Sequence, residues 1–260
     1  MCLILLAWRA HPDYPLVLGG NRDEAYERPS APAKFWKDDP QIFGGRDLEM
    51  GGTWLGITRS GRIAAVTNYR DGSGAVAARS RGELTAGFLR SSATPRAYLN
   101  ELAPHAQDYR GYTLIVGDQG QLFASSNRGG GIEELTPGVH GVSNHLMNTP
   151  WPKIVRGKQR LKALLKAGEV ELTDGLFHGL ADRTVAPDAQ LPDSGVGLQR
   201  ERELSPAFVA GERYGTRATT VILVSRRNEV VIVERRFGAR GASLGETSQR
   251  FALQRRAAVS

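Results

Sequence analysis

The chain has 260 residues, of which 40% are apolar and 23% charged, values that are typical of a folded globular protein and exclude general disorder. Its single cysteine excludes an internal disulfide framework and any cysteine-rich zinc or iron–sulfur site. The formal net charge is +7, but the arginines are dispersed and no nucleic-acid-binding module is present. We therefore expect no nucleic-acid partner, and a charge that serves solubility or attracts a small anionic ligand.

The apolar first segment, residues 2–8, is too short for a signal peptide, lacks a basic region before it and runs directly into Arg9 and His11. A buried strand is the better interpretation. No other segment approaches the ~20 apolar residues that cross a bilayer. We expect a cytoplasmic protein without a transmembrane segment, folded as a single domain over residues 1–260. Nothing in the sequence indicates a protein partner.

The first half of the chain predicts mainly strands. Apolar runs at 2–8 and 15–20 indicate a hairpin, and 51–58 with 62–67 indicate a second one. Two segments with helical spacing of apolar residues follow, at 82–91 and 95–106, where Thr94-Pro95 supplies a cap and a first helical position. A third hairpin is predicted at 112–117 and 121–125, with shorter strands near 132–135 and 138–142.

The second half begins with an amphipathic helix, predicted over 153–167. Residues 183–212 are rich in Pro, Asp, Gly and Arg without periodicity, which predicts a long surface loop that could serve as a lid. A last hairpin is predicted at 218–225 and 230–235. Strands, then helices, then strands again indicate an α+β fold with two stacked, mainly antiparallel sheets flanked by helices.

Cys2 is the first candidate for chemistry. A small residue at position 2 normally permits removal of Met1, which would leave Cys2 with a free α-amine. The reference pKa is about 7.7–8.0 for that amine and about 8.5 for a thiol, so the amine can accept the thiol proton near neutral pH. Position alone therefore predicts a nucleophile and its base in one residue. The alternative is a small buried cysteine at the edge of the first strand.

Polar segments at the ends of other strands supply further candidates. Arg22 and Asp23 could hold the ammonium and thiolate and bind a substrate carboxylate, or could form only a solvated ion-pair turn. Asn68 and Asn144 could donate amide hydrogens to an oxyanion, and Arg217 could stabilise the thiolate or an anionic substrate. As alternatives, Asn is common in turns and Arg before a strand is often an edge charge. The candidate ligand-binding residues come from the same or similar segments: Asn21, Glu24, Trp54, Tyr69, His145 and Tyr214.

Nine segments carry a resemblance to a known family: Met1-Cys2, Asn21-Arg22-Asp23-Glu24, Gly51-Gly52-Thr53-Trp54, Thr67-Asn68-Tyr69-Arg70, Ser80-Arg81-Gly82, Leu114 to Asp118, Gly138 to Asn144, Trp151-Pro152-Lys153 and Tyr214 to Val221. In order and spacing they closely resemble the NRDE family, also called the transport and Golgi organisation 2 family. That family is similar to N-terminal-nucleophile (Ntn) hydrolases with an N-terminal cysteine, such as bile-salt and penicillin V acylases. The resemblance implies their four-layer αββα sandwich and a site of Cys2, Arg22, Asp23, Asn68, Asn144 and Arg217. One departure is that Arg22 and Asp23 are adjacent here, whereas the acylases separate the two.

The resemblance implies two functions. One is an enzyme in which Cys2 cleaves an amide, ester or thioester of a small or acyl-bearing molecule and no cofactor is required. The other is a carrier of haem or an acyl lipid, since family members are associated with haem trafficking and lipid metabolism. Its positive charge would suit haem propionates, and the candidate axial ligands are Cys2, His11, His105, His140, His145 and His178.

Two other patterns are set aside. Gly241 to Gly245 matches G-x-S-x-G, but that motif needs a later Asp and His, and no histidine follows His178. His140 and His145 lack a carboxylate at metal-binding spacing, so we expect no metal site.

Overall fold

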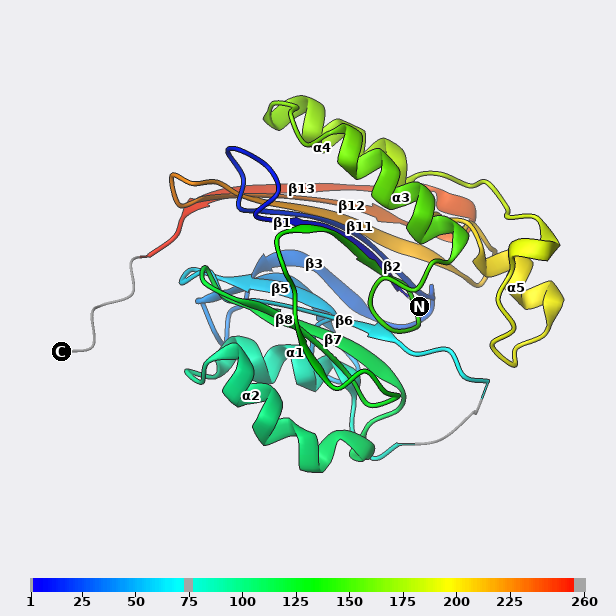
Figure 1. Cartoon of the computed structure of the whole chain (residues 1–260), viewed down its shortest axis with the longest axis horizontal. Coiled ribbons are helices and arrows are strands. Elements are labelled where there is room, and N and C mark those ends of the chain that lie inside the picture. Colours follow the sequence, from blue (N-terminus) through cyan, green and yellow to red (C-terminus); the bar gives the residue numbers. More distant parts are fainter. Residues whose placement is uncertain (1, 73–76, 255–260) are drawn as a thin grey trace.

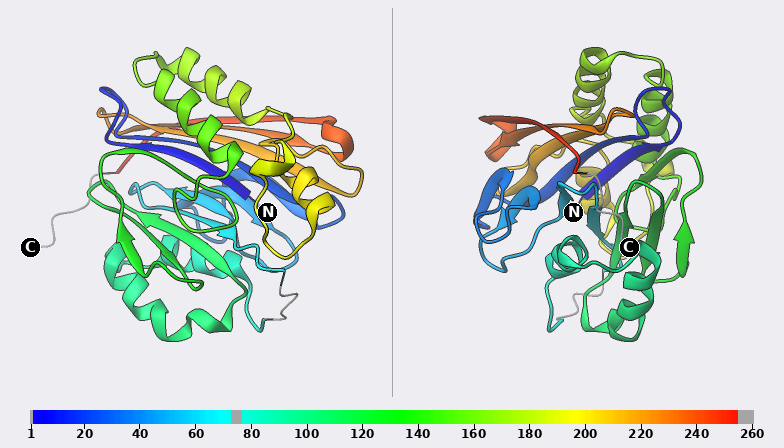
Figure 2. Two further views of the ribbon diagram at one scale, coloured as in Figure 1. Left: turned by 45° about the vertical axis from the view of Figure 1, so that its right-hand side comes forward. Right: turned by 90° about the vertical axis from the view of Figure 1, so that its left-hand side faces the viewer.

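Two antiparallel sheets stacked face to face form the centre of the molecule, and helices cover both outer faces. The structure is a computed structural model that describes residues 2–72 and 77–254. Within them, sheet A has the strand order β10-β1-β2-β11-β12-β13 and sheet B the order β3-β4-β5-β6-β7-β8-β9. Helices α3 (Pro152–Ala163) and α4 (Glu169–Leu180) cover sheet A, and α1 (Arg81–Arg90) and α2 (Pro95–Leu102) cover sheet B (Figure 1). The further views in Figure 2 show the same order of layers, which confirms the predicted αββα arrangement.

Sheet A carries the first strand in its interior. Its strands are β1 (Cys2–Trp8), β2 (Leu16–Ala25), β10 (Gly138–Val142), β11 (Tyr214–Val224), β12 (Glu229–Phe237) and β13 (Ser243–Ala252). Every residue of β1 is buried, because β10 and β2 flank it, helices cover one face and sheet B covers the other. The first and last predicted hairpins are thereby confirmed.

Sheet B is formed by the middle of the chain. Its strands are β3 (Ser30–Phe35), β4 (Ile42–Asp47), β5 (Leu55–Thr58), β6 (Ile63–Asn68), β7 (Tyr112–Gly117), β8 (Leu122–Ser126) and β9 (Ile132–Glu134). The two predicted hairpins of this region are β5–β6 and β7–β8. The hairpin β5–β6 begins later than expected, because residues 51–54 form a loop rather than part of β5.

Three separate apolar clusters hold the four layers together. Alternation along β1 serves two of them: Ile4 and Leu6 point into the core between the sheets, whereas Leu3 and Leu5 pack against the α3 and α4 side. A third cluster, which includes Phe88 of α1, lies between sheet B and its helices. A strand buried on both faces reads as a continuous apolar run, which is why β1 was recognisable from the sequence.

Caps and prolines explain where the helices begin. Ser80 and Glu83 form a capping box at the start of α1, and Thr94 with Pro95 opens α2 as predicted. The helix predicted over 95–106 is shorter, and a 3₁₀ turn (Ala103–Asp108) replaces its second half. The helix predicted over 153–167 ends at Ala163.

The segment 183–212 is not the long irregular surface loop that the sequence predicts. It contains a 3₁₀ turn (Asp188–Gln190) and α5 (Leu198–Leu204), and it ends in a buried stretch that includes Phe208. Glu201 of α5 forms a buried ion pair with Arg70, at the end of β6. Apolar residues spaced irregularly can still be buried when they cap the end of a sandwich. No helix in the described parts of the chain is long and apolar enough to span a bilayer.

Candidate active site

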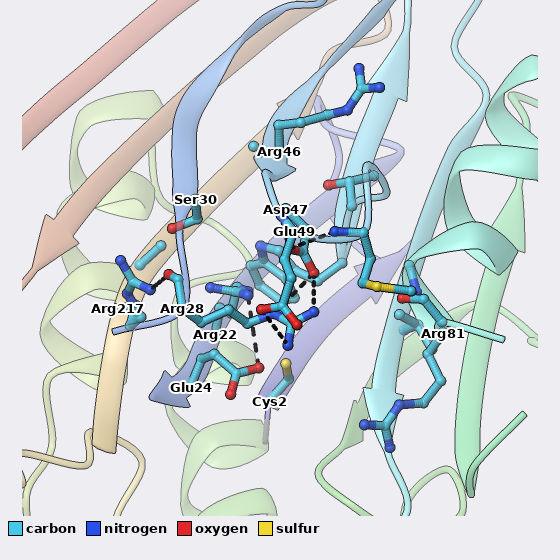
Figure 3. A pocket seen from close by; sticks show the side chains of 18 of the residues that line it. Cys2, Arg22, Glu24, Arg28, Ser30, Arg46, Asp47, Glu49, Arg81 and Arg217 are labelled. Carbon is cyan, nitrogen blue, oxygen red and sulfur yellow. Dashed lines mark hydrogen bonds and ion pairs between the residues drawn. The ribbon is translucent and has the colours of Figure 1, made fainter. Parts of the chain in front are cut away.

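A cavity of about 410 Å³ lies between the inner faces of the two sheets, bounded on one side by the start of α1 (Figure 3). Cys2 contributes to its wall and is 6% exposed. Of the described residues that line the cavity, eight are arginines (Arg22, Arg28, Arg46, Arg79, Arg81, Arg110, Arg217 and Arg236) and five are acids (Asp23, Glu24, Asp47, Glu49 and Glu234). The thiol therefore faces a strongly polar, net positive space.

Strand register places four cavity residues in one line across sheet A. Cys2 pairs with Arg22, Arg22 with Ala218, and Ala218 with Arg236. Directly paired residues of antiparallel strands point to the same face, so all four side chains face sheet B. We call Cys2, Arg22, Ala218 and Arg236 the inner row.

A β-bulge in β11 makes this arrangement possible. Thr216 pairs with Asp23 and Ala218 with Arg22, which leaves Arg217 as an extra residue between them. If Arg217 were an ordinary strand residue rather than a bulge, Thr216 and Ala218, two positions apart, would share a face. The bulge instead sends Thr216 to the helix side with Asp23 and Ala218 to the cavity with Arg22.

Arg217 reaches the turn that connects β2 to β3. Its guanidinium donates to the carbonyl of Ala25 at 3.1 Å and to the carbonyl of Arg28. Burial lowers its pKa. The side chain lines the cavity, and its donors are partly engaged in holding this turn.

Asp23 borders the cavity, but its carboxylate belongs to the helix side of the sheet. It is 1% exposed and accepts a hydrogen bond from Thr216 Oγ1 at 2.7 Å. Burial raises its pKa, and the positive charges of the amino terminus and of Lys153 lower it. Arg22 and Asp23, adjacent in sequence, therefore act on opposite faces of one strand.

Burial also raises the pKa of the Cys2 thiol. The charges of the amino terminus and of Arg22 lower it, while Asp23 and Glu24 raise it further. Burial therefore favours the protonated form of this thiol.

Asn144 and Asn68 join the two sheets next to Cys2. Asn144 is fully buried, has a left-handed backbone (φ 58°), and donates from Nδ2 to the carbonyl of Asn68 at 3.1 Å. Ser143 Oγ donates to the carbonyl of Cys2 at 3.1 Å. Asn68 lines the cavity, whereas Asn144 lies just behind the wall with one amide hydrogen already engaged. Strained backbone of this kind is often found at functional sites.

The other candidate ligand-binding residues divide into two groups. Glu24 and Trp54 line the cavity. Asn21 does not, because it faces the helices and donates to the carbonyls of Leu180 and Ala207. Tyr69, His145 and Tyr214 also lie outside the lining: the Tyr69 hydroxyl is 2.7 Å from His145 Nε2, and the Tyr214 hydroxyl donates to the Asp23 carbonyl.

None of the five histidines is among the lining residues that the structure describes. His11 and His140 contact backbone carbonyls through Nε2, and His145 is held by Tyr69 and Thr149. Sulfur is supplied to the wall by Cys2 and Met50. Across residues 2–72 and 77–254, no three His, Cys, Asp or Glu side chains are grouped to hold a metal ion.

Several wall residues were not proposed from the sequence. Arg28 forms ion pairs with Asp47 (2.8 Å) and Glu49 (3.3 Å), and Arg81 stands on the wall opposite Arg22 (Figure 3). Arg81 belongs to the Ser-Arg-Gly segment noted above, so a signal was present for it. Arg28 and Arg236 belong to no such segment.

Two of the glycine-containing segments meet at this wall. A Cβ on Gly52 would lie 2.5 Å from the carbonyl carbon of Gly82, and Thr53 N donates to Gly82 O at 3.3 Å. Only a residue without a side chain permits this approach at Gly52. The contact fixes the loop that carries Trp54 against the helix that carries Arg81.

Comparison with known proteins agrees with this arrangement. Residues 1–239 match the model of the family described as Transport and Golgi organisation 2. The chain is similar to the Transport and Golgi organization 2 homologs of Mus musculus and Homo sapiens, each 35% identical over 275 residues that cover 98% of this chain and 100% of theirs. Among solved structures it is similar to the C2A mutant of conjugated bile acid hydrolase from Clostridium perfringens, with a TM-score of 0.52 and 7% identity over 97% of this chain and 92% of that one. That likeness shows the fold, which is the Ntn-hydrolase fold expected from the sequence.

Proposed function

We propose that this chain, which belongs to the transport and Golgi organisation 2 family, is an N-terminal-cysteine hydrolase that cleaves an amide, ester or thioester of an acyl-bearing molecule. The observation that carries the proposal is the position of Cys2. The lone thiol of the chain lies in the wall of the cavity between the sheets, next to Arg22 and close to Asp23. The proposal requires that Met1 be removed, because the α-amine of Cys2 is the base.

The chemistry balances within this site. The α-amine of Cys2 takes the thiol proton as sulfur attacks the carbonyl carbon, and the resulting ammonium protonates the leaving amine, alcohol or thiol. The product is a thioester at Cys2. Water then attacks that thioester and gives one proton to the amine, which passes it to the departing sulfur, so that the carboxylic acid and the free thiol are released.

Other residues assist these steps. Arg22 stabilises negative charge on sulfur, and the Asp23 carboxylate stabilises the ammonium from the other side of the strand. An oxyanion needs a donor, and Asn68 and the second amide hydrogen of Asn144 are the candidates. Because burial raises the pKa of the thiol, the reaction needs the α-amine as the base that takes its proton.

The carrier hypothesis remains a second proposal, supported by the arginine-rich lining. A haem or acyl lipid with carboxylates would find eight arginines in the wall, but the described lining offers Cys2 and Met50 rather than histidine as ligands to iron. This hypothesis expects stoichiometric binding without turnover.

Intact mass spectrometry with a thiol-reactive acyl probe tests the enzyme proposal. We expect a mass without Met1 and rapid acylation of one site, followed by loss of the acyl group with time. Cys2→Ala should not be acylated. A variant with one alanine inserted before Cys2 keeps the thiol but not its amine, so it should acylate much more slowly. Retained Met1, or a label that never leaves, would refute the enzyme and favour the carrier.

A further inference from the structure

Neither arginine of the inner row has a hydrogen-bonded acid among the residues that the structure describes. Arg22 approaches Glu24 only to 3.8 Å. Arg236 has a buried Nε without a hydrogen-bond partner, and no carboxylate of the described chain lies within ion-pair distance of its guanidinium. A buried donor without a partner is costly, so such groups are commonly satisfied by something that binds.

Five other arginines of the cavity are engaged by the protein itself. Arg28 is paired with Asp47, Arg46 with Asp38 and Arg79 with Glu83. Arg81 and Arg217 donate to backbone carbonyls. Those contacts leave little demand for an external anion.

Glu234 is the acid that could neutralise Arg236 from the same strand, and it is already engaged elsewhere. It is 4% exposed, and its carboxyl accepts from the backbone N of Ala33 at 2.8 Å and from Thr220 at 3.4 Å. Burial raises its pKa, whereas the hydrogen bonds from Ala33 and Thr220 and the charges of Arg236 and Arg22 lower it. Glu234 thus lies near Arg236 but makes its hydrogen bonds with other groups, and it forms no ion pair with Arg236.

The strand pairing of the inner row sets the distance between the Arg236 side of the cavity and the Cys2 thiol. Adjacent strands lie ~4.8 Å apart, so Ala218 is about 10 Å from Cys2, with Arg22 on one side and Arg236 on the other. Ala218 lies between the two arginines, and its small methyl side chain leaves space between them. We propose that this hollow over Ala218 is an anion subsite, where Arg22 and Arg236 bind a carboxylate or phosphate carried by the substrate about 10 Å from the carbonyl that Cys2 attacks.

This inference rests on the proposed function for its account of the substrate, but the subsite can be tested without turnover. A maleimide that carries a carboxylate on a chain long enough to span from Cys2 to Ala218 serves as the probe, and the primary amide of the same compound is its neutral control. The second-order rates of labelling of Cys2 by the two compounds give a ratio that reports attraction for the anion.

We expect the ratio to favour the carboxylate in the wild-type protein and to fall about tenfold in Arg236→Gln, the effect of one hydrogen-bonded charge. Arg236→Lys should recover part of it. The matched control is Arg235→Gln, which removes the same charge one residue earlier, on the opposite face, where Arg235 contacts Glu246 and the ring of Phe177. That variant should leave the ratio unchanged. Equal ratios in wild type and Arg236→Gln would overturn the inference.

Calorimetry with inorganic phosphate and, separately, acetate covers the case in which Cys2 reacts with neither maleimide. That result would count against the proposed nucleophile and not against the subsite. Binding of either anion that weakens at least about tenfold in Arg236→Gln would support the subsite and show which anion it prefers. Binding that is equal in both proteins, or absent from the wild type, would refute it.

Discussion

Removal of one partner from the buried ion pair between Arg70 and Glu201 should strongly lower the stability of the protein. The two side chains are only 5% and 3% exposed. Arg70 also lies over the ring of Trp151, with 4.8 Å from its guanidinium carbon to the ring centroid, and Glu201 accepts a hydrogen bond from Ser194. Replacing Glu201 by Leu leaves a guanidinium without a counter-charge in the interior, which costs about 3–5 kcal/mol of unfolding free energy.

Urea denaturation of Glu201→Leu, Arg70→Met and the double variant measures this cost as a double-mutant cycle. Because both charges are gone, the double variant should be nearly as stable as wild type, within about 1–2 kcal/mol. The matched control is Arg202→Gln. Arg202 is on the same helix as Glu201, and its exposed ion pair with Asp188 should contribute less than about 1 kcal/mol. If Glu201→Leu costs no more than Arg202→Gln, or if the two single effects simply add, the pair is not a buried, coupled unit and this reasoning is wrong.

Two further predictions concern Gly52 and Lys153. Gly52→Ala should lower the unfolding free energy by about 1–3 kcal/mol, because its Cβ would meet the backbone of Gly82. Gly51→Asn should change it by less than about 0.5 kcal/mol, because that site is open and Asn accepts a positive φ; equal losses in thermal unfolding would contradict the close approach. Burial lowers the pKa of Lys153 from 10.5 to about 8. The unfolded chain therefore holds this proton more tightly, so the stability of wild type relative to Lys153→Met should rise as pH increases from about 8 to about 10.5, and denaturation curves that stay parallel over that range would disprove the shift.

Elements buried on both faces could be predicted from the sequence, and half-exposed ones could not. β1 is a continuous apolar run, and β7 is apolar except for Thr113 and is buried throughout. β3 contains Pro32 and is largely half-buried, β4 contains Gly44 and Gly45, and β13 has a single buried residue, Phe251. Their pairing depends on neighbouring strands rather than on their own pattern. Helix α4 escaped prediction because Gly175 and Gly179 interrupt its apolar face.

Five of the six site residues that the resemblance implies line the cavity, namely Cys2, Arg22, Asp23, Asn68 and Arg217, whereas Asn144 is not among the lining residues. The roles of all six stay a prediction. Their separate orientations were not predicted, because the sequence placed Arg22 and Asp23 after the end of the second strand, whereas β2 continues to Ala25 and its alternation sends the two to opposite faces.

Strand pairing explains why Arg236 was missed. Its closeness to the thiol arises from three successive strand pairings, through Arg22 and Ala218. Nothing in the residues around Arg236 indicates which of the alternating side chains of β12 will face inward, since that depends on register.

The extra residue Arg217 divides β11 into two parts whose side chains alternate out of step. Thr216, before it, faces the helices with Asp23, and Ala218, after it, faces the cavity with Arg22. Deleting Arg217 would restore regular alternation and leave Thr216 opposite Asp23 and Ala218 opposite Arg22. Adding or removing one residue elsewhere in β11 would instead exchange the inward and outward sides of every residue on one flank, so that Thr216 would present its hydroxyl to the cavity or Ala218 would leave it. In this family fold, the length of one strand, as much as the identity of its residues, sets which surface each side chain serves.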